Sequence, residues 1–117
     1  MDLDRLTIND SQEDYHELLR ELRSGQAQLI DIREQSEWEQ ARFQCAIHVP
    51  LSDLIQGKGI QILKELRQQN KKIYLHCRSG QRVQKAREVL AQYGCTEFRL
   101  ITLNMLEMLE QGFRLTS

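Results

Sequence analysis

The stretch Lys71-Lys-Ile-Tyr-Leu-His-Cys-Arg-Ser-Gly-Gln-Arg82 joins a short apolar run to a cysteine and a loop. Ile73 to Leu75 are residues typical of a strand, and a helix-period pattern begins directly behind Gly80. We therefore expect a strand, a loop and a helix. The backbone N–H groups of such a loop and the N-terminus of the helix converge on one point, which attracts an anion.

Cys77 lies at the rim of this expected anion cradle. The residues assigned to the cradle follow it directly in the sequence: Arg78, Ser79, Gly80, Gln81 and Arg82. The positive end of the helix and the two arginine charges favour the thiolate form of a cysteine placed there. The pattern thus indicates a thiolate nucleophile that faces an anionic substrate.

The length and composition of the chain predict one soluble domain that spans residues 1–117. With 117 residues and 40% hydrophobic content, the chain is large enough for one core and too short for two ordinary domains. The N-terminus lacks the basic and apolar regions of a signal peptide, so a cytoplasmic location is expected. Three cysteines, an odd and sparse set, give no disulfide framework, which agrees with a reducing compartment.

Charge is distributed unevenly along the chain although the formal net charge is only −1. Residues 1–40 carry eleven acids against four bases, whereas residues 64–87 carry eight bases against Glu65 alone. The basic segment brackets Cys77, which favours a small anion as its partner. Nucleic acid is not expected as a partner, because no aromatic residues alternate with these bases to form a stacking platform.

Strands and helices are expected to alternate along the chain. The expected strands are Leu6 to Ile8, Gln28 to Ile32, Ala46 to Val49, Ile73 to Leu75 and Phe98 to Ile101. The expected helices run from the N-cap Ser11 to Gly25, from Glu34 to Gln40, from Ile60 to about Asn70, from the cysteine loop to Gly94, and from Leu103 to Gly112. This alternation predicts a parallel sheet covered on both faces, with ligands at the carboxyl ends of its strands.

Four short motifs together resemble the rhodanese family, the single-domain sulfurtransferases. They are Asp31-Ile-Arg33, Glu37-Trp38, Ala46-Ile-His-Val-Pro50 and Cys77-Arg-Ser-Gly-Gln-Arg82. The resemblance covers most of the chain and implies an α/β/α sandwich around a five-stranded parallel sheet. It also implies that Cys77 carries a persulfide and that Asp31, Arg33 and Glu37 brace the site.

Several positions depart from the family pattern. Ala41-Arg42-Phe43 stands where relatives usually have Gly-His-Ile, and Cys45 replaces a common glycine. Leu103-Asn104 stands where a Gly-Gly pair is usual, and Met108 where a tryptophan is frequent. Because glycines allow the backbone to approach a site closely, their loss is expected to narrow the pocket or to alter the preference for an acceptor.

Two other functions compete with sulfur transfer. Cysteine-dependent phosphatases and arsenate reductases of related fold need a Cys-x5-Arg loop, whereas Cys77 and Arg82 give Cys-x4-Arg, a shorter ring that suits a terminal sulfur. A non-catalytic rhodanese-like module that binds a partner usually lacks the cysteine, which is present here. Sulfur transfer is therefore the preferred interpretation.

The remaining cysteines and histidines do not indicate a metal site. Cys45 and His48, even when combined with His76 and Cys77, lack a recognised spacing of zinc ligands. His48 is expected to form a structural hydrogen bond and His76 to point into the packing. Cys95 is expected to be small buried filler, although a resolving role for Cys45 or Cys95 stays open.

The resulting hypothesis is a transfer of sulfur in two steps. The thiolate of Cys77 takes a sulfane sulfur from a donor such as thiosulfate and passes it to an acceptor. The acceptor is cyanide or a thiol, and protein thiols are among the thiols considered. No external cofactor is expected, because the carried sulfur is held covalently. No membrane partner is expected, since no apolar run is long enough to cross a bilayer.

Overall fold

A five-stranded parallel sheet forms the centre of the protein, with the strand order β1-β6-β5-β2-β4. The computed structural model describes residues 7–8 and 14–116. The strands are β1 (Thr7–Ile8), β2 (Ala27–Asp31), β4 (Ala46–His48), β5 (Lys72–His76) and β6 (Arg99–Ile101). The prediction of five parallel strands is confirmed; Leu6, expected as the first residue of β1, lies outside the described residues.

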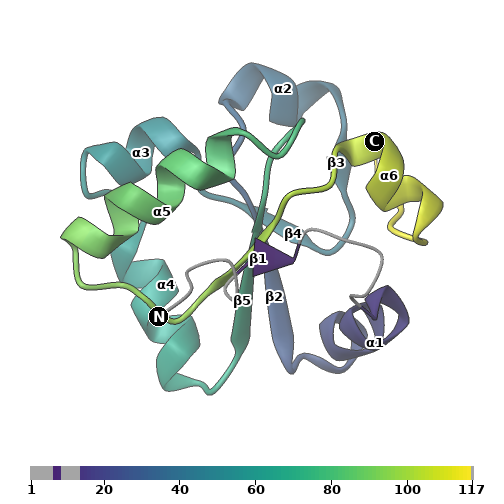
Figure 1. Cartoon of the computed structure of the whole chain (residues 1–117), viewed down its shortest axis with the longest axis horizontal. Helices are drawn as coiled ribbons and strands as arrows, with labels where there is room; N and C mark the ends of the chain where they lie inside the picture. The colour runs from purple at the N-terminus through teal and green to yellow at the C-terminus, as the bar shows by residue number, and fades with distance from the viewer. Residues whose placement is uncertain (1–6, 9–13, 117) are drawn as a thin grey trace.

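Helices cover both faces of the sheet, as Figure 1 shows, so the predicted α/β/α sandwich is confirmed. One face carries α3 (Leu51–Ile55), α4 (Ile60–Gln68) and α5 (Arg82–Gln92). The other carries α1 (Tyr15–Ser24) and α6 (Met105–Glu110). Within the described part of the chain, no helix has both the length and the apolar character that a membrane span requires.

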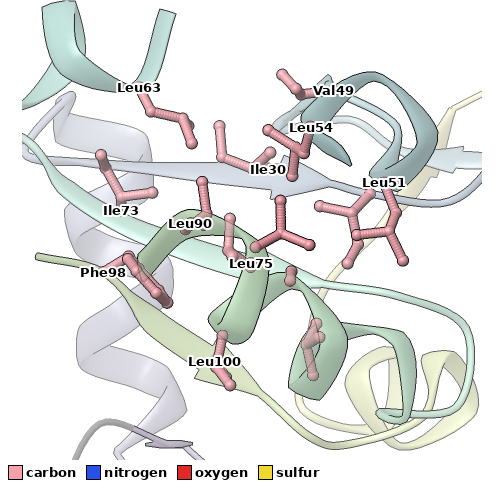
Figure 2. Packing of buried hydrophobic residues seen from close by; sticks show 14 of the residues in the cluster. Ile30, Val49, Leu51, Leu54, Leu63, Ile73, Leu75, Leu90, Phe98 and Leu100 are labelled. Atoms are coloured by element: carbon pink, nitrogen blue, oxygen red, sulfur yellow. The ribbon is translucent and has the colours of Figure 1, made fainter. Parts of the chain in front are cut away.

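Each face of the sheet has its own apolar core, and β5 contributes to both. Ile73 and Leu75 point toward α4 and α5, in the cluster that Figure 2 shows, whereas Tyr74 packs against α1 on the opposite face. All three side chains are buried, which explains why this strand is apolar at successive positions. Burial of one such aliphatic side chain contributes about 2 kcal/mol.

The ends of α1 are set by two local signals. Asp14 caps its N-terminus by accepting a hydrogen bond from the backbone N–H of Glu17 at 3.0 Å. Gly25 ends the helix with a φ of 82°, as predicted from its position. Ser11, which the sequence suggested as the N-cap, lies outside the described residues, and Asp14 takes that role because the helix begins at Tyr15.

The remaining elements are short. α2 (Gln35–Gln40) follows β2 at the carboxyl end of the sheet, where the sequence predicted an acidic helix. α3 was not predicted, because its five residues behind Pro50 are too few to give a periodic pattern. The antiparallel ribbon of β3 (Arg42–Phe43) and β7 (Leu115–Thr116) was missed for the same reason.

Candidate functional site

The parallel register brings the ends of three strands together. Asp31, the last residue of β2, lies opposite His48 of β4 and His76 of β5. Cys77 follows β5 directly, so the expected nucleophile lies at the carboxyl edge of the sheet. A hydrogen bond of 3.1 Å from the N–H of Ile32 to the carbonyl of His76 continues the pairing beyond the strands and fixes the start of the loop.

The loop from Cys77 to Gln81 turns back toward its own cysteine. The backbone N–H of Gly80 donates to the Sγ of Cys77 at 3.2 Å. α5 begins immediately afterwards at Arg82, and the side chain of its N-cap Gln81 forms no capping hydrogen bond. The positive end of α5 is thus directed at the loop, as the sequence predicted. The thiol of Cys77 is fully buried, whereas Arg78, Ser79 and Gln81 are exposed.

Gly80 is required by both its conformation and its surroundings. Its φ of 86° is unfavourable for residues with a side chain, and a Cβ atom at this position would lie 2.1 Å from the backbone oxygen of Thr102. In the same segment as Thr102, the N–H of Met105 donates to the carbonyl of Arg78 at 3.0 Å. The segment that connects β6 to α6 therefore holds the cysteine loop through backbone contacts.

Arg82 forms a two-pronged ion pair with Glu37. Its Nη1 and Nη2 atoms donate to the two carboxylate oxygens at 2.6 and 2.8 Å. The same carboxylate accepts from the N–H of Glu34, and Glu34 accepts from the hydroxyl of Ser52. The hydrogen bonds from Arg82 lower the pKa of Glu37 to about 2. The charge of Arg82 is thus engaged by Glu37, and the pair links α5 to α2.

Asp31 and Arg33 form a second ion pair, which is buried. The Nη2 of Arg33 lies 2.8 Å from one oxygen of Asp31, and its Nε lies 3.0 Å from both oxygens. Arg33 also donates to the carbonyl of Ala41 at 2.6 Å. Asp31 is fully buried and Arg33 only 4% exposed. A buried pair of this kind is costly unless hydrogen bonds replace the lost hydration, as those to both oxygens of Asp31 and from the Nε and Nη2 of Arg33 do here.

His76 is buried beside this pair, and its ring packs against Phe43 on the face of the sheet opposite to the Cys77 side chain, as alternation along the strand predicts. Its Nδ1 lies 3.3 Å from the carbonyl of Cys77 and its Nε2 lies 3.6 Å from Asp31. A neutral imidazole carries one proton and donates to only one of these acceptors. Burial nevertheless lowers the pKa of His76 to about 4, against the opposite effect of Asp31.

His48 has a structural role on the neighbouring strand. Its Nε2 donates to the carbonyl of Arg33 at 2.7 Å, which confirms the expected structural hydrogen bond. Its ring stacks on Trp38 with 4.7 Å between the centroids, and the guanidinium of Arg42 lies over the same indole ring at 4.9 Å. The stack holds α2 against β4.

Most of the expected site residues therefore lie around one loop. Glu37 contacts this loop directly, and the loop itself consists of Cys77, Arg78, Ser79, Gly80, Gln81 and Arg82. Asp31 and Arg33 lie one layer beneath and are bound to each other. The contacts of Thr102 and Met105 were not predicted, because they are made by backbone atoms, which leave no signal in the sequence. The N–H of Glu34 donates to Glu37 as in a capping box, but Glu34 is not a usual N-cap residue, so the pattern carries no signal for this link.

The other two cysteines lie away from this loop. Cys45 and Cys95 are both partly buried and unpaired, and burial raises the pKa of the Cys45 thiol. Within residues 7–8 and 14–116, no group of three or more histidines, cysteines or acids is placed to hold a metal ion.

Comparison with known proteins points to one family. Residues 14–108 match the model of the family described as "Rhodanese-like domain". An uncharacterized protein of Bacillus subtilis, YqhL, is 40% identical over 79 residues, which are 66% of this chain and 58% of that protein. The chain thus spans less than two thirds of the length of this curated relative.

Solved structures support the fold. The solution structure of protein hp1203 from Helicobacter pylori has a TM-score of 0.73 and 22% identity, and the match covers 98% of this chain and 92% of that one. The human single-domain sulfurtransferase TSTD1 has a TM-score of 0.64 and 24% identity, with 90% and 96% of the two chains covered. A rhodanese-related protein from Thermoplasma volcanium has a TM-score of 0.68 and 23% identity, with 94% and 96% covered.

The buried imidazole of His76 predicts a loss of stability in mild acid. Its folded pKa of about 4 lies below its ordinary value of 6.5, so the unfolded chain binds more protons between these values. The stabilising contribution is complete above about pH 6.5 and is lost as the pH falls toward 4, by up to about 3 kcal/mol. Urea unfolding at several pH values measures this loss, which should be smaller in His76→Gln. The exposed His16 gives the control His16→Gln, and equal pH slopes in all three proteins would contradict the prediction.

The close packing of Gly80 predicts a large cost for Gly80→Ala. The added Cβ collides with the backbone of Thr102, so the substitution should destabilise the protein by about 3 kcal/mol or more. Gly94 provides a matched control, because its φ is 75° and a Cβ added there would meet no atom within 4 Å. Gly94→Ala should cost only about 1 kcal/mol. Equal unfolding free energies for the two variants would show that the Thr102 contact is unimportant.

Proposed function

The chain belongs to the family of rhodanese-like domains, and from this premise we propose that it is a sulfurtransferase that carries sulfane sulfur as a persulfide on Cys77. The observation that supports this most directly is the N–H of Gly80, which lies 3.2 Å from the Sγ of Cys77. A donor in this position stabilises negative charge on sulfur, both on the attacking thiolate and on the persulfide.

In the proposed first step, the thiolate of Cys77 attacks the outer sulfur of a donor such as thiosulfate. The sulfur–sulfur bond of the donor breaks, and sulfite leaves with the bonding electron pair. In the second step, cyanide or an acceptor thiolate attacks the terminal sulfur of the persulfide and restores the thiolate of Cys77. Neither step needs an external oxidant, reductant or cofactor.

The two arginines of the loop have different roles in this proposal. Arg78 is exposed at the rim, and within the described part of the chain no acid forms an ion pair with its side chain. It is therefore the residue that attracts an anionic donor. Arg82 acts as a positioning residue, because its planar fork is already bound to Glu37 and fixes the start of α5.

The full burial of the Cys77 thiol favours one alternative, a module that binds a partner without catalysis. In such a module the same loop would present Arg78, Ser79 and Gln81 as a recognition surface, and the cysteine would act only as core. The two functions differ in one observable property, which is the reactivity of Cys77 toward a sulfur donor.

Thiosulfate treatment tests the proposal. We expect intact-mass and peptide-mapping measurements to find one added sulfur on Cys77, which Cys77→Ser should lack while it keeps the same fold. Cys45→Ser and Cys95→Ser are the matched controls and should gain the sulfur as the unmodified protein does. If a panel of sulfane donors leaves Cys77 unmodified, the sulfurtransferase is excluded and the binding module becomes the better explanation.

The proposed division of roles between the arginines predicts different kinetic effects. Arg78→Gln should raise KM for thiosulfate by about fivefold at low salt and should make the rate less sensitive to ionic strength. Arg82→Lys keeps the charge but loses the fork, so it should lower kcat and leave the salt dependence unchanged. Steady-state rates at several ionic strengths measure both effects. Lys85→Gln, on the exposed side of α5, is the control, and identical effects of the two arginine variants would contradict the proposed roles.

A further inference from the structure

A cavity of about 320 Å³ lies on the face of the sheet that α1 and α6 cover, away from the Cys77 loop. It is bounded by α1, by the turn between β3 and β4, and by the segment between α6 and β7. The residues that line it are Leu19, Leu22, Arg23, Gln44, Cys45, Gly112 and Arg114. Since one water molecule occupies about 30 Å³ in the liquid, this volume equals that of about ten waters and admits a short-chain ligand.

Two positive side chains line this cavity. They belong to Arg23 and Arg114, and none of the described lining residues carries a carboxylate. Within residues 7–8 and 14–116, neither guanidinium forms an ion pair. Two exposed arginines thus line one cavity without an ion-pair partner among these residues, and the planar fork of each matches the two oxygens of a carboxylate.

Two other cavities of similar size provide a contrast. They lie beside β5 and β6, where Arg67 pairs with Glu97 and Lys72 pairs with Glu21, although Lys64 and Arg99, which also line them, form no ion pair within the described part of the chain. Glu97 lines both of these cavities. An anionic ligand there would compete with carboxylates of the protein itself. In the cavity beside α1, the lining residues that the structure describes include no such competitor.

The other walls are apolar or neutral. Leu19 is 8% exposed, and its Cδ1 would lie 3.1 Å from a Cβ atom added at Gly112. The absence of a side chain at Gly112 therefore leaves room for Leu19. Leu22 extends this apolar wall along α1. Burial raises the pKa of the Cys45 thiol, which keeps this wall uncharged, although nearby Arg23 acts in the opposite direction. The backbone of Arg114 is held by a hydrogen bond of 2.8 Å from the N–H of Gln44 to its carbonyl.

We propose that this cavity binds a carboxylate on a short apolar chain, with Arg23 and Arg114 on the carboxylate and Leu19 and Leu22 on the chain. Two sources supply this chemistry: a free short-chain acid, and the C-terminus of a polypeptide that ends in an apolar residue. The site is independent of sulfur transfer at Cys77, because the two share no residue.

Cys45 in the cavity wall serves as a reporter for the first test. Iodoacetate carries a carboxylate and iodoacetamide does not, so the ratio of their rates at a single thiol cancels the thiolate fraction of that thiol. Peptide mapping should give a ratio at Cys45 that falls by about threefold or more in Arg23→Gln/Arg114→Gln. Arg20→Gln is the matched control, since Arg20 lies on the same helix, pairs with Glu17 and does not line the cavity. A ratio that the double substitution leaves unchanged would overturn the proposal.

Binding itself is measured by NMR. Isotope-labelled protein is titrated with hexanoate and with hexanol, and the chemical shifts of its backbone amides are recorded. Hexanoate should shift the amides of the lining residues, and hexanol should shift them far less. A pentapeptide that ends in leucine, as the free acid and as the amide, tests the second source. Binding of hexanoate alone supports a free acid, and binding of the peptide acid but not the amide supports a C-terminus. The proposal fails if hexanol matches hexanoate, if neither acid binds, or if Arg23→Gln/Arg114→Gln leaves the shifts intact.

Discussion

The buried carboxylate of Asp31 is the constraint around which the carboxyl edge of the sheet is built. An isolated charge at this depth would be prohibitive, so Arg33 must lie against it, and the Nη2 of Arg33 also donates to the carbonyl of Ala41. The pair thereby ties the end of β2 to the end of α2. His76 lies against the same carboxylate and stays neutral because burial outweighs the attraction of one carboxylate that Arg33 already neutralises.

The cysteine loop is held on this base from two sides by different means. On one side Glu37 and Arg82 join side chains, and on the other the segment from Thr102 to Met105 offers backbone atoms. The departures from the family pattern are accommodated here. Asn104, in place of a glycine, caps α6 by accepting from the N–H of Glu107 at 2.8 Å, and Met108 fills a fully buried position of the core. Asn104 thus stabilises α6 at a position where a glycine is usual.

The sequence was sufficient to predict the sheet and the position of Cys77, because apolar runs that end in a loop leave a pattern of adjacent residues. It was insufficient wherever the interaction joins distant or very short segments. Glu37 and Arg82 are 45 positions apart, and nothing in either position indicates that they meet. The sequence therefore suggested that both arginines of the loop bind the substrate, whereas the guanidinium of Arg82 binds the carboxylate of Glu37. The cavity beside α1 escaped notice for a similar reason, since Arg23 and Arg114 come from opposite ends of the chain.

Rigidity and attraction are therefore supplied by different charges in this domain. The buried pair of Asp31 and Arg33 and the rim pair of Glu37 and Arg82 are each neutral as a unit, so they order the loop without drawing ions to it. The exposed Arg78 and the N-terminus of α5 remain as the positive groups that act on an approaching anion. Under the proposed chemistry this separation is useful, because the site must hold one negatively charged sulfur species after another. A charge that also positioned the loop would shift each time the anion came or went, and the loop would lose its geometry between the two steps.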